Sequence, residues 1–287
     1  MKKFQQYCEH QGVRPLPADP TTVVNFLGFI KTQGLSAATA RTYVAALGNQ
    51  HKESNFESPT ARSIVKAALR GYGKLKPQKP DTRLPITINI MRQIKTFIAS
   101  SDLCYYDQRM LWFSFCLAFF GFLRVGEFTT PTSTYFDPER CLRFRDVYVS
   151  PNGSHLTVII RASKTDQHAQ GHQVVIPATN RSVCAVKACR KFFAILSSLN
   201  PELDEIPLLQ FSNKQFLTRS SFQKHLRSFL RGIPDSRRYS THSFRIGAAT
   251  AAAQKGHEAD SIKRAGRWKS TAYQGYIRTV AMCPKLY

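Results

Sequence analysis

Residues 241–250 read THSFRIGAAT, and they begin an expected helix that continues to Lys255. Thr241 is a good N-cap residue, so His242 and Arg245 fall in the first turn, three positions apart on one face. The helix dipole already places partial positive charge at this end, so cations here need a compensating anion. Free N–H groups together with Arg245 would make a phosphate site. On its own, the short motif H-x-x-R is far more often a surface histidine and arginine.

The chain is basic along its whole length. Its 287 residues include 41 Lys and Arg against 18 Asp and Glu, a formal net charge of +23. Residues 1–82 carry a net charge of +7 and the remainder +16, which excludes a basic tail on an otherwise neutral enzyme. Apolar residues make up 43% of the chain, enough for folded cores. Both halves are expected to face the same polyanion, and nucleic acid is the first candidate.

Cysteine usage and hydropathy predict a soluble intracellular protein. The seven cysteines are odd in number and include no C-x-x-C pair, which favours reduced thiols over a disulfide framework. The longest apolar stretch, Leu111 to Leu123, is shorter than the roughly 20 residues that a membrane helix needs. Two lysines near the N-terminus are not followed by an apolar region, so we expect no secretory signal and no membrane partner.

The patterning predicts two domains and a linker: a helical domain over 1–73, a basic Pro-rich linker over 74–85, and a larger domain over 86–287. The fold class is mainly α with a small antiparallel β-sheet. Strands are expected over Arg143–Val149, His155–Arg161 and Val174–Ile176. The expected helices are Val23–Lys31, Ser36–Gly48, Thr60–Leu69, Ile88–Ser100, Asp107–Phe122, Arg181–Leu199, Ser220–Leu230, His242–Lys255, Glu258–Ala265 and one from about Thr271.

Three further features are ordinary when taken singly. Arg124 and Glu127 follow a buried apolar helix, where a cation at a helix C-terminus is simply stabilising. Lys164 lies in a polar loop between two expected strands, a usual place for a solvated lysine. Near the C-terminus, Trp268 precedes Tyr273 and Tyr276, and tyrosines three apart on a helix are more often packing residues than nucleophiles.

Taken as an ordered set, these residues resemble the active-site series of the tyrosine recombinase (phage integrase) family. The series is Arg124, Glu127, Lys164, His242, Arg245, Trp268 and Tyr276. HSFRIGAAT and the closing YIR are similar to the Cre recombinase, and the resemblance to Cre, the Xer proteins and lambda integrase covers most of the chain. The ending GRWKSTAYQGYIR is most similar to the recombinases of eukaryotic DIRS and Ngaro retrotransposons.

The resemblance implies a helical core-binding domain joined to a catalytic domain that breaks and rejoins DNA. It implies that Tyr276 attacks the scissile phosphate to give a 3′-phosphotyrosyl bond, while Arg124 and Arg245 neutralise the phosphate oxygens. Lys164 would protonate the leaving 5′-oxygen, His242 would assist proton transfer, and Trp268 would donate its indole N–H. Glu127 would orient the arginine and the histidine. No metal is expected, because the two guanidinium groups would supply the charge neutralisation that a metal otherwise supplies. Neither ATP nor another cofactor is expected, because the covalent link conserves bond energy.

Two alternatives at the level of single residues stay open. Tyr273 is a rival nucleophile; Tyr276 is preferred because it matches the tyrosine of the family's YIR ending. His168 and His172 have H-x3-H spacing, but they lie in a Gly/Gln-rich loop without a nearby Cys or acid pair, so solvated side chains are favoured over a metal site.

The resemblance also implies a clamp around duplex DNA. Candidate phosphate contacts, each equally compatible with a solvated basic face, are Arg41, Lys52, Arg62, Lys66, Arg70, Lys74, Lys76 and Lys79. Such contacts make binding salt-dependent, with log K falling about 0.9 per phosphate neutralised. By family resemblance we expect a tetramer on DNA, in the nucleus of a eukaryote or the cytoplasm and nucleoid of a bacterium.

Both ends of the chain are short for the family. Only Lys2 to His10 precede the first Pro-rich turn, which predicts a trimmed N-terminus, and eleven residues follow Tyr276. Two other functions stay open beside recombination. One is a type IB topoisomerase, which shares the chemistry; the other is a transposon-derived DNA-binding protein without catalysis.

Overall fold

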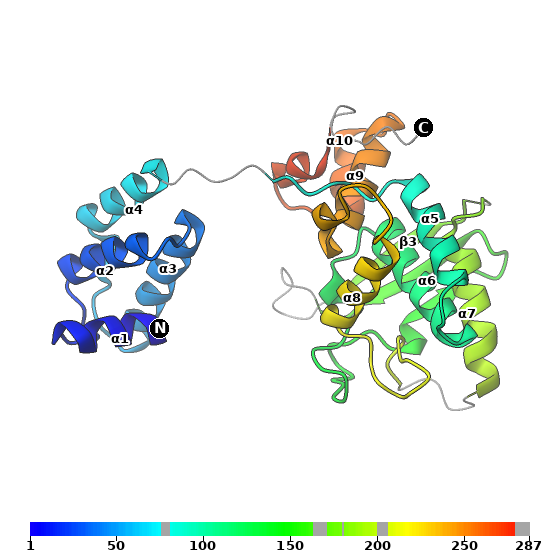
Figure 1. The fold of residues 1–287 in the computed structure, drawn as a ribbon, viewed down its shortest axis with the longest axis horizontal. Helices are drawn as coiled ribbons and strands as arrows, with labels where there is room; N and C mark the ends of the chain where they lie inside the picture. Colours follow the sequence, from blue (N-terminus) through cyan, green and yellow to red (C-terminus); the bar gives the residue numbers. More distant parts are fainter. Residues whose placement is uncertain (76–80, 163–170, 180, 200–205, 279–287) are drawn as a thin grey trace. The chain divides into compact units, whose positions relative to one another are not determined.

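The computed structural model describes residues 1–75, 81–162, 171–179, 181–199 and 206–278 (Figure 1). It divides into two compact units, Met1–Asp81 and Thr82–Tyr287, and each is described by itself. Together they confirm the predicted fold class, because the described elements are mainly helices with one three-stranded antiparallel sheet.

Unit 1 is helical around a small aromatic core. Its elements are α1 (Lys2–Gln11), α2 (Pro20–Thr32), α3 (Ala37–Glu53), the 3-10 turn η1 (Pro59–Ala61) and α4 (Ser63–Leu75). Asp19 caps α2 by accepting the Thr21 N–H at 2.7 Å, and Ser36 caps α3 by accepting the Thr39 N–H at 3.1 Å. The rings of Phe4 and Phe26 meet edge to face, 5.0 Å apart, in the centre of the unit.

Several helix ends in unit 1 differ from the prediction, among them those of α4, which spans Ser63–Leu75 and not Thr60–Leu69. Helix α3 was expected to close at Gly48 but continues to Glu53. Gly48 is there for packing, since a Cβ on it would lie 2.8 Å from the Thr60 hydroxyl of the neighbouring turn. The helix instead ends where Asn55 takes a left-handed conformation.

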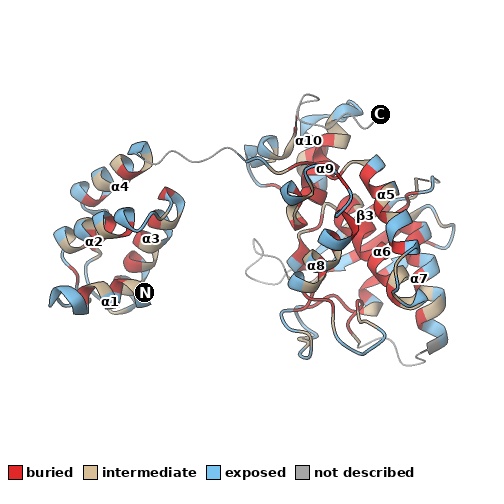
Figure 2. Cartoon of the chain, viewed as in Figure 1, coloured by how far each residue is buried: buried red, intermediate tan, exposed pale blue. Residues whose placement is uncertain are grey.

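Unit 2 holds the sheet and the remaining helices. Its elements are α5 (Ile88–Ala99), α6 (Tyr105–Phe120), η2 (Val125–Glu127), η3 (Phe144–Asp146), β1 (Val147–Val149), β2 (His155–Ile160), β3 (His172–Pro177), α7 (Ala185–Leu199), α8 (Arg219–Phe229), η4 (Ser236–Arg238), α9 (Thr241–Gln254), α10 (Ala259–Ala265) and η5 (Thr271–Tyr276). Figure 2 shows α6 buried in the middle of this unit, as its apolar sequence predicts. Phe115 of α6 stacks on Phe244 of α9 at 5.4 Å, so α9 rests directly on the core.

The sheet has the predicted order β1-β2-β3, with Val147 opposite Val158 and Leu156 opposite Ile176. The first strand is shorter than expected, because residues Phe144–Asp146 form a 3-10 turn. Asp146 explains that turn: its buried carboxylate accepts the Arg143 N–H at 2.9 Å and an Arg161 guanidinium N–H at 2.6 Å. Burial alone would raise the pKa of Asp146, but these hydrogen bonds outweigh it and lower the pKa.

The described parts of the expected linker pack against their own units. Lys74 and Leu75 continue α4, while residues 82–86 form an extended strap on unit 2. Leu84 and Ile86 are buried, and their N–H groups donate to the carbonyls of Arg238 and Ser243 at 3.1 and 3.0 Å. The prolines of residues 74–85 led to the prediction of a linker over this stretch. Residues 76–80 lie outside the described structure.

Gly247 of α9 allows the strap to approach the helix closely. An added Cβ would lie 1.9 Å from the Ile86 carbonyl oxygen. We expect Gly247→Ala to lower the melting temperature of unit 2 by about 2–10 °C, because overpacking costs about 1–3 kcal/mol. Thermal unfolding followed by tryptophan fluorescence measures this, since both tryptophans lie in unit 2. The control is Gly232→Ala, also in unit 2, where an added Cβ meets nothing within 4 Å. Equal midpoints for the two variants would contradict this packing.

Candidate active site

Arg124 stands at the start of the turn η2 and is held there by Glu127. Helix α6 ends at Phe120, two residues before the prediction, and Phe122 takes a left-handed backbone conformation. The chain then turns so that the Arg124 N–H donates to one carboxylate oxygen of Glu127 and its guanidinium to the other, both at 2.9 Å. The position of Arg124 in the sequence had indicated a cation at the C-terminus of a helix. In the structure Arg124 instead stands at the start of the turn η2.

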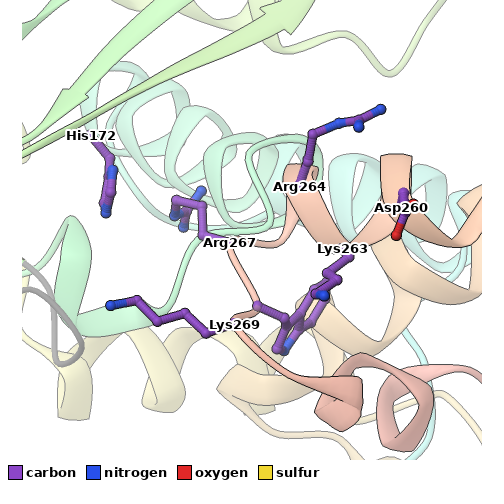
Figure 3. A pocket seen from close by; sticks show the side chains of 7 residues that line it. His172, Asp260, Lys263, Arg264, Arg267 and Lys269 are labelled. Atoms are coloured by element: carbon purple, nitrogen blue, oxygen red, sulfur yellow. The ribbon is translucent and has the colours of Figure 1, made fainter.

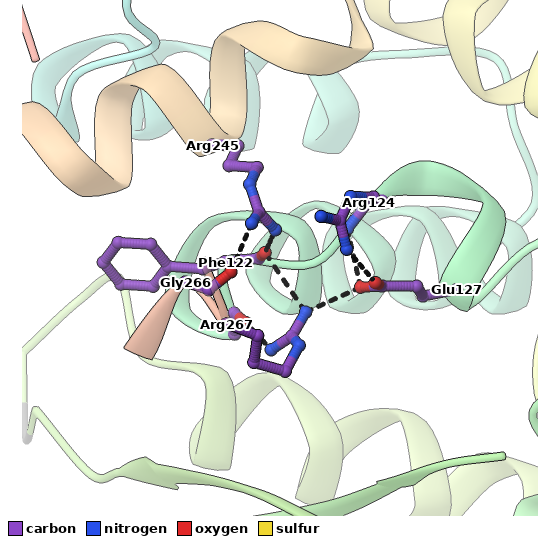
Figure 4. A network of polar contacts seen from close by, with 7 residues as sticks. Phe122, Arg124, Glu127, Arg245, Gly266 and Arg267 are labelled. Atoms are coloured by element: carbon purple, nitrogen blue, oxygen red, sulfur yellow. Dashed lines mark hydrogen bonds and ion pairs between the residues drawn. The ribbon is translucent and has the colours of Figure 1, made fainter. Parts of the chain in front are cut away.

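Glu127 also binds a second arginine, which the sequence analysis missed. The Glu127 side chain is 1% exposed, and Arg267 donates to it at 2.7 Å (Figure 4). Arg267 reaches this place because its own backbone is left-handed, with φ of 55°, directly after α10. The resemblance predicted that Glu127 orients an arginine and the histidine; the described contacts of Glu127 go to two arginines.

Arg245 brings a third guanidinium to the same place, from the second turn of α9. It is 1% exposed and donates to the carbonyl oxygens of Phe122 and Gly266 (Figure 4). Its Nε is buried without a hydrogen-bond partner among the described residues. Burial, followed by repulsion from Arg124 and Arg267, lowers the pKa of Arg245 to about 10, so the group stays charged at neutral pH.

The N-terminus of α9 differs in detail from the prediction. Ser240, not Thr241, is the N-cap residue, and its N–H donates to the Ser243 hydroxyl at 3.0 Å. Thr241 is buried, and its N–H donates to the Gln223 side chain of α8 at 2.9 Å. His242 lies in the first turn of the helix, as expected, whereas Arg245 lies in the second turn and not in the first.

His242 is half-buried and surrounded by cations. Its ring lies edge to face against Tyr276, with the ring centres 6.2 Å apart. Burial lowers the pKa of His242, and the nearby Arg83 and Arg245 lower it further. The imidazole is therefore neutral at pH 7 and can accept a proton.

Trp268 and Tyr276 complete the cluster. The Trp268 ring lies 5.1 Å from that of Tyr276, and the Arg245 guanidinium covers both, 4.2 Å from the tryptophan and 5.7 Å from the tyrosine. The rival Tyr273 ring contacts Trp268 at 6.4 Å. Both tyrosines belong to a 3-10 turn, Thr271–Tyr276, whose N-cap is Ser270. The sequence had predicted an α-helix here.

Gly266 makes room for the tryptophan. An added Cβ on Gly266 would lie 1.6 Å from the Trp268 ring, so only glycine fits there. Its carbonyl oxygen accepts from Arg245, so this residue serves both ring and guanidinium. The predicted Lys164 and His168 lie outside the described residues.

Beside this cluster lies a basic pocket of about 380 Å³ (Figure 3). Its lining residues are His172, Asp260, Lys263, Arg264, Arg267, Trp268 and Lys269. Since Arg267 and Trp268 belong to both the pocket and the cluster, the pocket extends the candidate site along α10. Within the described residues, no group of three or more His, Cys, Asp or Glu side chains is arranged to hold a metal ion.

Unit 1 brings half of the predicted DNA-contact residues to one groove. Arg41 of α3 and Lys66, Arg70 and Lys74 of α4 line a cavity of about 610 Å³. Arg62 lies elsewhere in an exposed ion pair with Glu57 at 2.8 Å, and Lys52 is exposed near the end of α3. Lys76 and Lys79 lie outside the described residues.

Comparison with solved structures identifies the fold. The chain has the tyrosine recombinase fold. It superimposes on the XerH site-specific recombinase bound to its difH substrate with a TM-score of 0.58 and 15% identity, over 91% of this chain and 67% of that one. The match to the Tn1549 transposon integrase in complex with transposon right-end DNA has a TM-score of 0.61 and 14% identity, over 97% and 87%.

The chain is also similar in sequence to an integrase/recombinase. The chain is 26% identical over 274 residues to an integrase/recombinase XerD homolog of Selenomonas ruminantium, covering 93% of this chain and 75% of the relative. The chain is thus similar, over nearly its whole length, to a tyrosine recombinase and integrase of the Xer type. No protein-family model matches it. In the part of the chain that the structure describes, no helix is long and apolar enough to cross a membrane.

The buried carboxylate gives a first prediction for this site. Glu127→Gln keeps the shape of the side chain but leaves Arg124 and Arg267 without their counter-charge. We expect a loss of about 3–5 kcal/mol in the free energy of unfolding, measured by urea titration with tryptophan fluorescence. Sulfate should restore part of the loss by binding the exposed cations of the native state. The exposed Glu139→Gln is the matched control, and an equal effect of the two substitutions would contradict the role of Glu127.

His242 gives a prediction about pH. Its folded-state pKa lies below the ordinary value of 6.5, so the unfolded chain takes up the proton first as the pH falls. The contribution of neutral His242 to the free energy of unfolding is complete above pH 6.5 and decreases as the pH falls below it. We expect His242→Gln to flatten the fall in unfolding free energy between about pH 7 and about pH 5. Urea titrations across this range measure it, with the exposed His257→Gln as control. If the unfolding free energies of the native chain and of His242→Gln fell in parallel with pH, His242 would not be the group responsible for this pH dependence.

Proposed function

We propose that the protein is a site-specific DNA recombinase or integrase that cleaves and rejoins strands through a 3′-phosphotyrosyl intermediate. One observation carries the proposal: Arg124, Arg245, His242, Trp268 and Tyr276, drawn from segments about 150 positions apart, lie around one place. A phosphodiester needs neutralisation of its oxygens, a nucleophile and a proton donor for the leaving group. The guanidinium groups, the Tyr276 hydroxyl and Lys164 would supply these three functions.

In this mechanism the Tyr276 oxygen attacks the phosphorus as the bond to the 5′-oxygen breaks. The tyrosyl proton passes to a nearby base, for which neutral His242 is the candidate, and the departing oxygen takes a proton from Lys164. Arg124 and Arg245 stabilise the negative charge that develops on the phosphate oxygens. The reverse reaction, with a second 5′-hydroxyl as nucleophile and Tyr276 as the leaving group, rejoins the strand without ATP because no bond energy has been lost.

The proposed partner is double-stranded DNA, bound by the basic groove of unit 1 as well as by the candidate active site. Tetramer assembly on DNA and an intracellular location, nuclear in a eukaryote, belong to the same hypothesis. The finer resemblance to DIRS and Ngaro retrotransposon recombinases remains a sequence-based prediction, which the bacterial Xer homolog and the structural relatives do not support.

The experiment is incubation of the protein with nicked suicide duplexes taken from the flanks of its gene. We expect a covalent protein–DNA adduct, mapped to Tyr276 by mass spectrometry, that Tyr276→Phe abolishes and Tyr273→Phe retains. Arg245→Lys keeps the charge but loses the two-pronged donor, so adduct formation should fall about 10²–10³-fold. Tyr276→Phe should bind the duplex as tightly as the native chain does.

Other outcomes would assign a different function. Relaxation of a supercoiled plasmid without any recombined product would favour the topoisomerase. Specific duplex binding without an adduct from the native chain would favour a DNA-binding protein that has lost catalysis. An adduct on Tyr273 would keep the chemistry but move the nucleophile.

A further inference from the structure

A second basic pocket lies on unit 2, between α5, α6 and the beginning of α7. It has a volume of about 200 Å³. Figure 1 shows α7 on the right-hand side of the unit, whereas the turn η5 that carries Tyr276, drawn in red, lies toward its upper left. None of the described lining residues of this pocket belongs to the candidate active site. The pocket therefore needs an explanation of its own.

The charged residues that line this pocket are all cations. Five of its lining residues are cationic: Lys95, Arg109, Arg181, Lys187 and Lys191. Its described lining includes no carboxylate. Helices α5 and α7 contain no Asp or Glu.

The one carboxylate of α6, that of Asp107, is already occupied. It accepts the Ser212 N–H at 2.8 Å and the Ser212 hydroxyl at 2.9 Å. The three helices that build the pocket therefore offer no counter-charge of their own. An external anion would balance the charge of Lys95, Arg109, Arg181 and Lys191.

The side chains of this pocket are held in place and retain an unused donor. The Lys95 ammonium donates to the Ser182 carbonyl at 2.9 Å and lies 5.7 Å from the centre of the Trp112 ring. The Arg109 guanidinium stacks on Tyr105 at 4.5 Å, and its Nε is buried with no hydrogen-bond partner among the described residues. A buried donor without an acceptor is unfavourable, and a phosphate oxygen would satisfy it.

We propose that this pocket binds a phosphate group, as an anion site separate from the candidate active site. Its volume is below the range of about 300–1,000 Å³ that is typical of sites for drug-sized ligands, so one or two phosphate groups fit better than a nucleoside. The beginning of α7 adds the positive end of a helix dipole to the same place. The phosphate comes either from a free anion such as pyrophosphate or from the backbone of nucleic acid. The proposal does not depend on recombinase activity.

Trp112 provides the test, because it lines the pocket and the chain has only two tryptophans. In a Trp268→Phe background, Trp112 is the sole fluorescent tryptophan. We expect a saturable change in its fluorescence on titration with sodium pyrophosphate, with ionic strength held constant by NaCl. Arg109→Gln and the exposed Lys191→Gln should each weaken this binding at least ten-fold. Arg140→Gln, an exposed residue outside the pocket with the same change of charge, should leave it unchanged.

Isothermal titration calorimetry of the full chain with its native Trp268 repeats the measurement. Arg124→Gln in the candidate active site should leave this site occupied, which separates the two anion sites. A duplex that changes Trp112 fluorescence and competes with pyrophosphate would identify nucleic acid as the source. Binding of pyrophosphate alone would identify a free anion. No saturable binding of either, or an equal loss in Arg140→Gln, would overturn the proposal, whatever the outcome of the Tyr276 adduct experiment.

Discussion

Three guanidinium groups lie close together in unit 2, and the buried carboxylate of Glu127 makes their proximity possible. Arg124 and Arg267 bind it directly, and its charge also offsets part of the repulsion and burial that lower the pKa of Arg245. One carboxylate cannot neutralise three cations, so the cluster keeps a net positive charge in a partly desolvated place. Such a site attracts an anion strongly, because a bound anion relieves the repulsion that the fold has already imposed on the three cations.

The carbonyl groups around Arg245 fix where that charge points. Phe122 and Gly266 supply these acceptors from two turns, one after α6 and one after α10, and both turns depend on left-handed residues, Phe122 and Arg267. The site is therefore built by the ends of helices rather than by their regular parts. The fold itself orients the guanidinium donors, and this is the arrangement that the proposed phosphate chemistry would require.

Sequence predicted the helices and the sheet well, because their apolar periodicity and capping residues are local signals. The cluster of Arg124, His242, Arg245, Trp268 and Tyr276 was predictable only as a motif series from a family resemblance, since each residue alone is ordinary. Arg267 was missed because it is one cation in the basic run Lys263–Lys269, and its role depends on a left-handed backbone. The strap over residues 82–86 was missed because Pro85 and the basic, Pro-rich run before it indicate a linker, although Leu84 and Ile86 are buried.

The same strap ties the segment that carries Tyr276 to the rest of unit 2. Arg278, two residues after the tyrosine, is buried; its Nε donates to the Arg83 carbonyl at 3.4 Å and its N–H to the Thr250 hydroxyl at 3.1 Å. Thr250 in turn donates to the Tyr276 carbonyl at 3.3 Å. Since Thr250 belongs to the helix that carries His242 and Arg245, one helix holds both Arg245 and the backbone of Tyr276. Under the proposed function, the attacking tyrosine would belong to the same chain, because moving Tyr276 to another subunit would break these contacts.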